Sequence, residues 1–145
     1  KLKEQNFFIE TAKNFNNLYG SPFRNINNSR KRNELILFDI DWKGARNIRN
    51  HYNKTNIIDF FILPPSKSEL KRRLIKRGRD NSKEINLRLS YALDEMKHFK
   101  EYKYVLINKN IKNTVNDIKK ILEYYELITK NKTILNSNLK RIVNI

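Results

Sequence analysis

Residues 57–76 read IIDFFILPPSKSELKRRLIK and predict a buried strand followed directly by a helix. The run Ile57 to Leu63 is apolar, rich in β-branched and aromatic residues, and of strand length. Pro64-Pro65 ends the strand, because proline cannot donate to its hydrogen-bond ladder. Ser66 can cap the helix that follows, and Glu69 three residues later completes a capping box. The next leucines recur at helical spacing and give this helix an apolar face.

The same alternation of strand and helix continues on both sides of this stretch. Leu35 to Ile40 and Tyr104 to Ile107 are two more short apolar runs with the composition of buried strands. Helical periodicity marks residues 2–15, 42–52, 66–76, 82–99 and 114–129. This order predicts an α/β fold with a mostly parallel sheet and flanking helices. Because three strands are few for such a sheet, we expect a part of the fold to lie upstream of Lys1.

Two segments show neither pattern. We expect residues 16–29 to be irregular and residues 130–145 to form a loosely attached C-terminal extension.

Composition excludes several classes of protein. The 145 residues are 39% apolar, enough for one domain with a core. No apolar run approaches the roughly 20 residues that cross a bilayer, and no signal peptide is visible, so we expect a cytoplasmic protein. There is no cysteine, and the two histidines, His51 and His98, lie far apart. Disulfides, thiolate zinc sites and a histidine-built metal centre are therefore excluded.

The chain is strongly basic, with 31 lysines and arginines against 15 acidic residues and a net charge of +16. Its field should attract phosphorylated ligands or polyanions. The charge alone does not separate nucleotides from nucleic acid. Lysine among many asparagines and isoleucines is also typical of AT-biased coding.

Arginines lie at the edges of two predicted apolar helix faces. Arg73 and Arg77 are stacked neighbours four residues apart, and Arg88 borders the apolar face of the next helix. Like charges at this spacing cost about 0.2 to 0.5 kcal/mol, a cost that a bound anion such as phosphate removes. The alternative is that these arginines only solvate the edges of amphipathic helices.

Two aspartates end the first apolar strand. Asp39 and Asp41 alternate at the carboxyl end of residues 35–40, where ligands gather in open α/β sheets. An acidic residue there commonly holds Mg²⁺ beside a nucleotide phosphate. The alternative is a cap for the helix that starts at Trp42. A capping Asp41 and a metal-contacting Asp39 are compatible.

A phosphate-cradling loop is absent from the sequence. The pattern G-x-x-x-x-G-K-[ST] does not occur, and Gly20, Gly44 and Gly78 are too widely spaced to build one.

Several ordered motifs cover nearly residues 3 to 128 and extend in both directions from Phe60-Phe61-Ile62-Leu63-Pro64-Pro65-Ser66. The further motifs are Phe8-Ile9-Glu10, Asn17-Leu18-Tyr19-Gly20-Ser21, Asp39-Ile40-Asp41-Trp42-Lys43-Gly44-Ala45, Glu69-Leu70, Arg73-Leu74, Lys76-Arg77-Gly78, Arg88-Leu89-Ser90, Glu101-Tyr102-Lys103-Tyr104 and Val105-Leu106-Ile107-Asn108. In this order and at this spacing, the motifs together resemble those of guanylate kinases.

The resemblance implies a phosphate-loop nucleoside monophosphate kinase fold without its N-terminal strand and loop. It assigns residues 1–34 to the remainder of the GMP-binding region, 66–90 to a mobile lid, and 35–65 with 91–129 to the core. It implies phosphoryl transfer from ATP to GMP with Mg²⁺, in a monomer or homodimer.

The resemblance also implies roles for residues of the GMP site. Glu10 and Ser21 would hydrogen-bond the guanine base, Asp41 would assist at its amino group, and Tyr19 would contact the GMP phosphate. A carboxylate suits guanine, because the guanine N1 and N2 hydrogens are donors that adenine does not offer in this arrangement.

A second group of implied roles concerns the phosphates and ATP. Arg73, Arg77 and Arg88 resemble lid arginines that clamp the phosphates and stabilise charge during transfer, and the first two would also bind ATP. Asp39 resembles the acid near Mg²⁺, with contact through water, and Asn108 falls where the family contacts adenine.

The sequence departs from the family pattern at three places. Leu18 replaces a second tyrosine, Lys109 replaces an aspartate after Asn108, and the phosphate loop would precede Lys1. We therefore expect the 145 residues alone to be an inactive fragment. The alternatives are a guanylate-kinase-like scaffold that binds proteins without catalysis, which has no need of these arginines, and a nucleic-acid-binding protein, for which no recognition motif is present.

Overall fold

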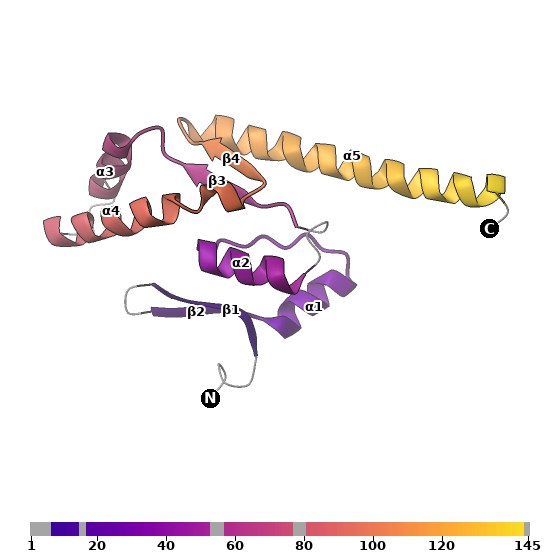
Figure 1. Cartoon of the computed structure of the whole chain (residues 1–145), viewed down its shortest axis with the longest axis horizontal. Helices are drawn as coiled ribbons and strands as arrows, with labels where there is room; N and C mark the ends of the chain where they lie inside the picture. Colours follow the sequence, from indigo (N-terminus) through magenta and orange to yellow (C-terminus); the bar gives the residue numbers. More distant parts are fainter. Residues whose placement is uncertain (1–6, 15–16, 53–56, 77–80, 144–145) are drawn as a thin grey trace. The chain divides into compact units, whose positions relative to one another are not determined.

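The computed structural model describes residues 7–14, 17–52, 57–76 and 81–143, and Figure 1 labels the helices and strands. The chain groups into two compact units. The first comprises Lys1–Phe60 and Asn86–Tyr104, and the second comprises Phe61–Ile85 and Val105–Ile145. The division into a GMP-binding part, core and lid stays a prediction.

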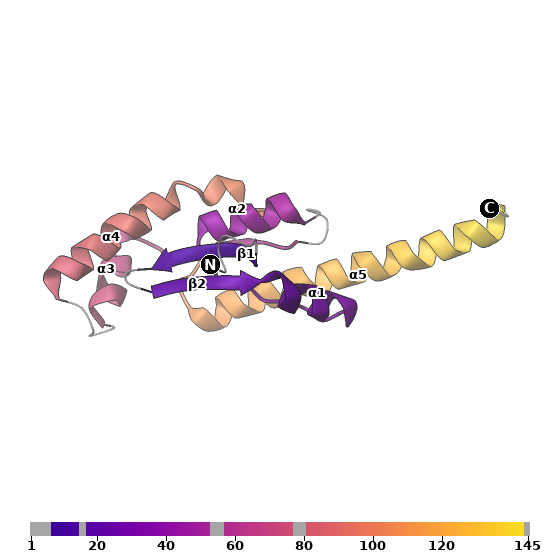
Figure 2. The same ribbon diagram turned by 90° about the horizontal axis from the view of Figure 1, so that it is seen from below.

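An antiparallel hairpin opens the described chain. β1 (Phe8–Asn14) pairs with β2 (Asn17–Pro22), and the two strands lie side by side in Figure 2. Glu10 is paired with Ser21, and the register is irregular between Phe8 and Glu10. The hairpin therefore brings these two polar side chains together on neighbouring strands.

The predictions for this N-terminal part are wrong where the structure describes it. β1 replaces the helix expected over residues 2–15, and β2 and α1 (Phe23–Lys31) replace the irregular chain expected over 16–29. The hairpin is stabilised by pairing across strands, which periodicity along one segment does not reveal. α1 ends just before Asn33, whose φ of 55° is a left-handed conformation that asparagine tolerates.

A small apolar core holds the first unit together. Its buried members are Ile9 from β1, Ile26 from α1 and Ile48 from α2 (Trp42–His51). Partly buried side chains pack around them: Phe23, Ile36, Phe38, Ile40, Tyr52 and Ile57. α2 packs against β1, and this contact places the start of α2 beside the hairpin.

Residues 35–40 were predicted to be a buried strand, and this prediction is only half right. Ile36, Phe38 and Ile40 pack on the core, whereas Leu35 and Leu37 are 82% and 92% exposed. This alternation is that of a strand. However, neither described sheet includes the segment, so it has no ladder and remains extended chain.

Residues 60–63 of the strand predicted at 57–63 form a parallel pair with the strand predicted at 104–107. β3 (Phe60–Leu63) and β4 (Tyr104–Ile107) make up one sheet. The Tyr104 N–H donates to the Asp59 carbonyl at 3.2 Å, and the Asn108 N–H donates to the Leu63 carbonyl at 2.7 Å. The second bond lies four residues further along both segments than the first, so the two strands run in the same direction.

Helices α3 (Lys67–Lys76) and α4 (Ser82–Met96) start at side-chain caps. The Ser66 hydroxyl accepts from the Glu69 N–H at 3.1 Å, as predicted. The reciprocal half of that capping box is absent from the described contacts, because the Glu69 carboxylate binds Arg72 and Arg73 instead. A full capping box occurs at α4, where Asn81 and Glu84 exchange two bonds of 3.0 Å.

The last helix, α5 (Ile111–Val143), is longer than predicted, since the sequence placed its end near residue 129. An ion pair from Lys130 to Glu126 at 2.7 Å, one turn apart, lies where the extension was expected to begin. Among the helices that the structure describes, none is long and apolar enough to cross a membrane.

Candidate functional site

The hairpin places a buried carboxylate beside a hydroxyl. The Ser21 Oγ donates a 2.7 Å hydrogen bond to Oε1 of Glu10, and Glu10 is only 4% exposed. The second carboxylate oxygen, Oε2, is buried without a hydrogen-bond partner among the described residues. A buried acceptor left unpaired costs free energy. Oε2 is therefore an acceptor held ready for a donor that the described protein does not supply.

The start of α2 lies next to the same carboxylate. Asp41 caps this helix, and its Oδ1 accepts from the Gly44 N–H at 2.8 Å. A Cβ on Gly44 would lie 3.2 Å from Oε2 of Glu10 and 3.4 Å from Oδ1 of Asp41. Glycine at this position thus lets the helix approach both carboxylates. The partial positive charge of a helix N-terminus favours two acidic groups there.

Glu95, another carboxylate of the first unit, has a raised pKa. Loss of contact with water raises the pKa of Glu95, near the end of α4, and the negative charge of Asp41 raises it further.

Asp39 stands apart from this group. It is exposed, two residues before Asp41 on the extended segment. Within the described part of the chain, no group of three or more His, Cys, Asp and Glu residues could hold a metal ion. A single exposed carboxylate fits an ion such as Mg²⁺ that is held mainly by water and substrate phosphates. The predicted role of Asp39 stays a prediction.

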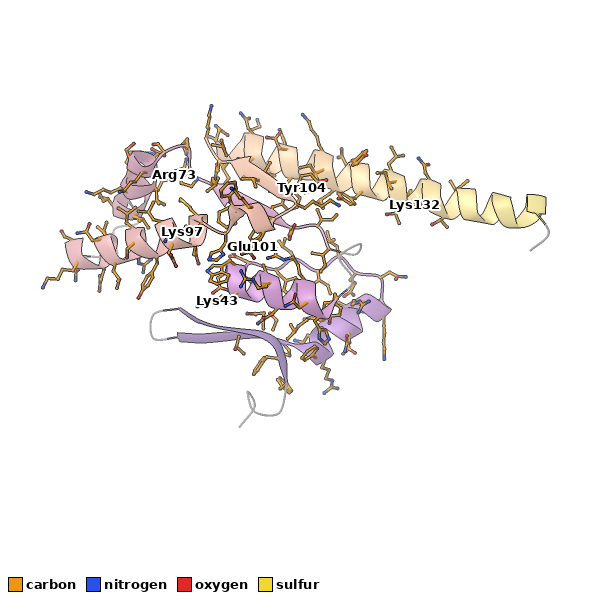
Figure 3. The ribbon with its side chains drawn as sticks, viewed as in Figure 1. Lys43, Arg73, Lys97, Glu101, Tyr104 and Lys132 are labelled. Atoms are coloured by element: carbon orange, nitrogen blue, oxygen red, sulfur yellow. The ribbon has the colours of Figure 1, made fainter. Side chains whose placement is uncertain are left out.

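A second cluster lies in the other unit and joins Arg73 to Asn108. Nη2 of Arg73 donates to the Asn108 carbonyl at 2.9 Å, and Nε donates to Oε1 of Glu69 at 2.8 Å. Figure 3 labels Arg73 on α3. Asn108 in turn accepts a 3.3 Å bond from the Thr114 hydroxyl at its Oδ1. Two of the three residues predicted to contact ATP, Arg73 and Asn108, are therefore direct neighbours.

Glu69 orients the arginines of α3. It binds Arg72 as well as Arg73, and these guanidinium groups, Arg72 first, lower its pKa to about 2. The carboxylate is therefore ionised at neutral pH. It holds the Arg73 side chain back along the helix and offsets the repulsion between adjacent cations.

The remaining predicted residues are placed only in part. Arg88 is partly exposed on α4 in the first unit. Tyr19 lies opposite Ala12 in the hairpin, but its side chain is outside the described side chains. Arg77 lies outside the described residues. The structure thus brings together Glu10, Ser21 and Asp41, and separately Arg73 and Asn108.

Sequence reasoning missed two features of the first unit. One is Gly44, whose only signal was a glycine inside a predicted helix, a hint of close approach by another group. The other is a set of ion pairs around Glu101, for which the sequence offers no signal, because its members lie up to 55 residues apart.

Comparison with a solved structure gives the class of the fold. The crystal structure of guanylate kinase from Anaplasma phagocytophilum matches 85% of this chain, with a TM-score of 0.68 and 32% sequence identity. The fold is that of the phosphate-loop nucleoside monophosphate kinases, as the sequence predicts.

The guanylate kinase family model matches residues 1–125, and the chain belongs to the guanylate kinase family. Guanylate kinase of Buchnera aphidicola subsp. Baizongia pistaciae is 44% identical over 134 residues, covering 92% of this chain. That of Rickettsia bellii is 39% identical over 122 residues, covering 84%. The chain spans 58% to 64% of the length of these three proteins.

Proposed function

We propose that this chain forms the guanine-binding part and the arginine-bearing helices of a guanylate kinase, which transfers a phosphoryl group from ATP to GMP. The observation that supports it most is the buried, unpaired Oε2 of Glu10 beside the start of α2. Guanine presents N1–H and N2–H donors on one edge, and a carboxylate accepts from both. Adenine has no such pair of donors, so this acceptor discriminates between the two bases.

The neighbouring groups complete recognition of the base in this proposal. Ser21 keeps Oε1 of Glu10 occupied and fixes the orientation of the carboxylate. Asp41, held by its cap to Gly44, accepts from the guanine amino group. Tyr19 contacts the phosphate of GMP.

Phosphoryl transfer requires positioning and charge stabilisation rather than a covalent intermediate. An oxygen of the GMP phosphate attacks the γ-phosphorus of ATP in line with the leaving ADP. Arg73, Arg77 and Arg88 bind phosphate oxygens and stabilise the charge that spreads over them. Asn108, joined to Arg73, contacts adenine. When bound, Mg²⁺ neutralises charge between the phosphates, and Asp39 would hold it through water.

The 145 residues by themselves should bind GMP without turning it over, because they contain no phosphate-cradling loop. The protein-binding alternative gives no reason to keep an unpaired carboxylate buried. The guanine site therefore favours the kinase.

The test is titration of the chain with GMP and with AMP by calorimetry, beside Glu10→Gln. We expect GMP to bind in preference to AMP, and Glu10→Gln to lose that preference with about a tenfold or greater drop in GMP affinity. Glu126→Gln is the matched control, since Glu126 is 65% exposed on α5. Equal binding of GMP by wild type and Glu10→Gln, or equal binding of GMP and AMP, would contradict the proposal.

A further inference from the structure

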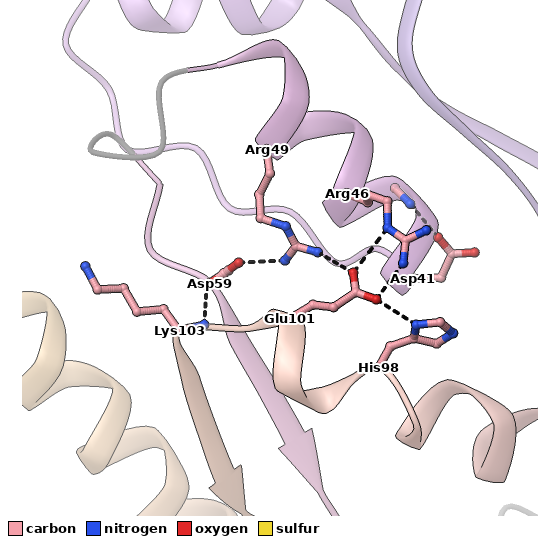
Figure 4. Close-up of polar contacts among 8 residues, drawn as sticks. Asp41, Arg46, Arg49, Asp59, His98, Glu101 and Lys103 are labelled. Carbon is pink, nitrogen blue, oxygen red and sulfur yellow. Dashed lines mark hydrogen bonds and ion pairs between the residues drawn. The ribbon is translucent and has the colours of Figure 1, made fainter.

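Several closely spaced ion pairs involve residues of α2, within the first unit. The Glu101 cluster comprises Arg46, Arg49, Asp59, His98 and Glu101 (Figure 4). Glu101, in the short 3₁₀ helix η2 (Phe99–Glu101), accepts from both arginines of α2. The distances are 2.5 Å from Arg46 Nη2 to Oε1 and 3.2 Å from Arg49 Nη2 to Oε2.

Both carboxylate oxygens of Glu101 take part in polar contacts with more than one side chain. Arg46 also reaches Oε2 through its Nε at 3.2 Å, and the Nδ1 of His98 lies 2.7 Å from Oε1. The hydrogen bonds from Arg46 and then His98 lower the pKa of Glu101 to about 2. The carboxylate is therefore charged at neutral pH, with four contacts from three side chains.

Arg49 extends the cluster to Asp59 and, through it, to Lys103. Its Nη1 donates to Oδ2 of Asp59 at 2.7 Å, and Oδ1 of Asp59 accepts from the Lys103 N–H at 2.8 Å. Arg49 and Asp59 are only 11% and 16% exposed, so this pair is shielded from water. α2 is thus tied both to η2 and to the residues that precede β3 and β4.

An aromatic contact ties the first residue of α2 to the same region. The Trp42 indole stacks on the His98 ring, with centroids 3.6 Å apart and planes 14° apart. The Arg46 guanidinium lies 4.6 Å from the centre of the indole ring. Trp42 directly follows Asp41, so this contact acts one residue from the guanine site.

Arg46 and Arg49 are three residues apart on α2 and converge on a single carboxylate. Two such anchors on one helix face restrict both its rotation about its axis and its movement along it. The position of α2 determines where Asp41 lies and how closely Gly44 approaches Glu10. The exposed part of the cluster adds little stability, because Arg46 is 48% exposed. Its effect is on geometry.

We infer that Glu101 is a positioning residue for guanine recognition, holding α2 so that Asp41 and Glu10 meet the base at one edge. This inference rests on the proposed function of the same site. Glu101 itself touches no substrate. It acts through Arg46, Arg49 and His98, and it links the guanine site to the segment that ends α4, the helix that carries Arg88.

The test compares Glu101→Gln with Asp94→Asn in GMP calorimetry. Asp94 is 63% exposed and its described ion pair is with Lys97, three residues along the chain at 2.8 Å, so it controls for loss of a carboxylate near the end of α4. We expect Glu101→Gln to bind GMP about tenfold more weakly, because a displacement near 1 Å misplaces the acceptors. Asp94→Asn should bind as wild type does.

Fluorescence of Trp42 separates positioning from a general loss of structure. Trp42 is the single tryptophan of the sequence and lies inside the cluster. GMP should change its emission in wild type and in Asp94→Asn, and much less in Glu101→Gln at saturating GMP. Arg46→Gln removes two of the four contacts to Glu101 but leaves the pair of Arg49 and Asp59, and it should give an intermediate affinity of about one third of wild type.

Two outcomes would overturn the inference. One is GMP affinity and Trp42 response in Glu101→Gln equal to those of wild type. The other is a loss of affinity that matches the fraction of unfolded protein, measured by circular dichroism on the same samples. Failure of the guanine site itself would look different, because Glu10→Gln would then also bind GMP as wild type does.

Discussion

Ser21 donates its hydroxyl proton to one oxygen of Glu10 at 2.7 Å, and the other oxygen of the same carboxylate is buried without a partner among the described residues. One oxygen is thus fixed by the protein and the other is left for a ligand. This asymmetry orients the carboxylate before any base arrives. It also means that the free protein keeps one buried acceptor without a hydrogen-bond partner among the described residues.

Glu10→Gln should therefore stabilise the free protein while weakening GMP binding. A neutral amide is cheaper to bury than a carboxylate, and Ser21 can still bond to it. We expect the free energy of unfolding, measured by urea denaturation without ligand, to stay equal or rise by about 1 kcal/mol. Ser21→Ala is the contrasting variant, because it leaves both oxygens unpaired and should lose about 1 kcal/mol or more. A marked destabilisation by Glu10→Gln would contradict the idea that the unpaired oxygen is held for a ligand.

Gly44→Ala should disturb the same site from the helix side. The added methyl would lie 3.2 Å from Oε2 of Glu10 and 3.2 Å from Cβ of Ile40, and both neighbours would have to move. Overpacking of this kind costs about 1 to 3 kcal/mol, more than the roughly 1 kcal/mol gained from the helix propensity of alanine. Calorimetry should show GMP binding lost or much reduced.

The control for this substitution is Asn47→Ala, at an exposed position of the same helix. It should change stability by no more than about 0.5 kcal/mol and leave GMP affinity unchanged. Normal GMP binding by Gly44→Ala would show that the approach of α2 to Glu10 does not matter for the ligand.

Local signals explain which elements could be predicted from the sequence. α2 has its capping aspartate, α3 its serine after two prolines, and β4 a short β-branched run, so each is specified within about ten residues. The cap of Asp41 follows from spacing alone, whereas the pairing of Glu69 with Arg72 and Arg73 replaces the predicted second half of the α3 capping box. Family resemblance supplied the roles, including that of Glu10.

Tertiary contacts explain what could not be predicted. Residues 8–14 have a composition that fits either helix or strand, and only pairing with residues 17–22 decides between them. Residues 35–40 show the opposite case, since their alternation is that of a strand but no ladder forms in the described sheets. The Glu101 cluster joins α2 to residues more than 50 positions later, which no local pattern reveals.

Asn81→Ala should weaken the start of α4 specifically. It removes the oxygen that accepts from the Glu84 N–H at 3.0 Å, and thereby one half of a reciprocal capping box. Loss of such a cap costs about 1 kcal/mol. Amide hydrogen exchange should show faster exchange in the first turn of α4, with α5 unaffected as the internal reference. Unchanged exchange at Glu84 would mean that the cap does not hold the helix start in solution.

The pH dependence of stability follows from the acidic groups with shifted pKa values. The pKa values of Glu69 and Glu101 fall from 4.5 to about 2 in the folded protein, mainly through Arg72 and Arg46 respectively. Because the unfolded chain binds protons more readily at these sites, the stability they contribute is present above pH 4.5. It is lost as the pH falls from 4.5 toward 2.

Glu95 acts in the opposite direction. Because its pKa is raised in the folded state, protonation of Glu95 at pH values above the range of that loss stabilises the fold. Denaturation midpoints measured from pH 7 downward should therefore stay level or rise slightly, and then fall below pH 4.5. A Glu69→Gln, Glu101→Gln double variant should be less stable than wild type at neutral pH, and its denaturation midpoint should fall less steeply as the pH is lowered. Glu126→Gln should lose much less stability at neutral pH. A fall of equal steepness in the double variant would show that these two ion-paired carboxylates do not control acid unfolding.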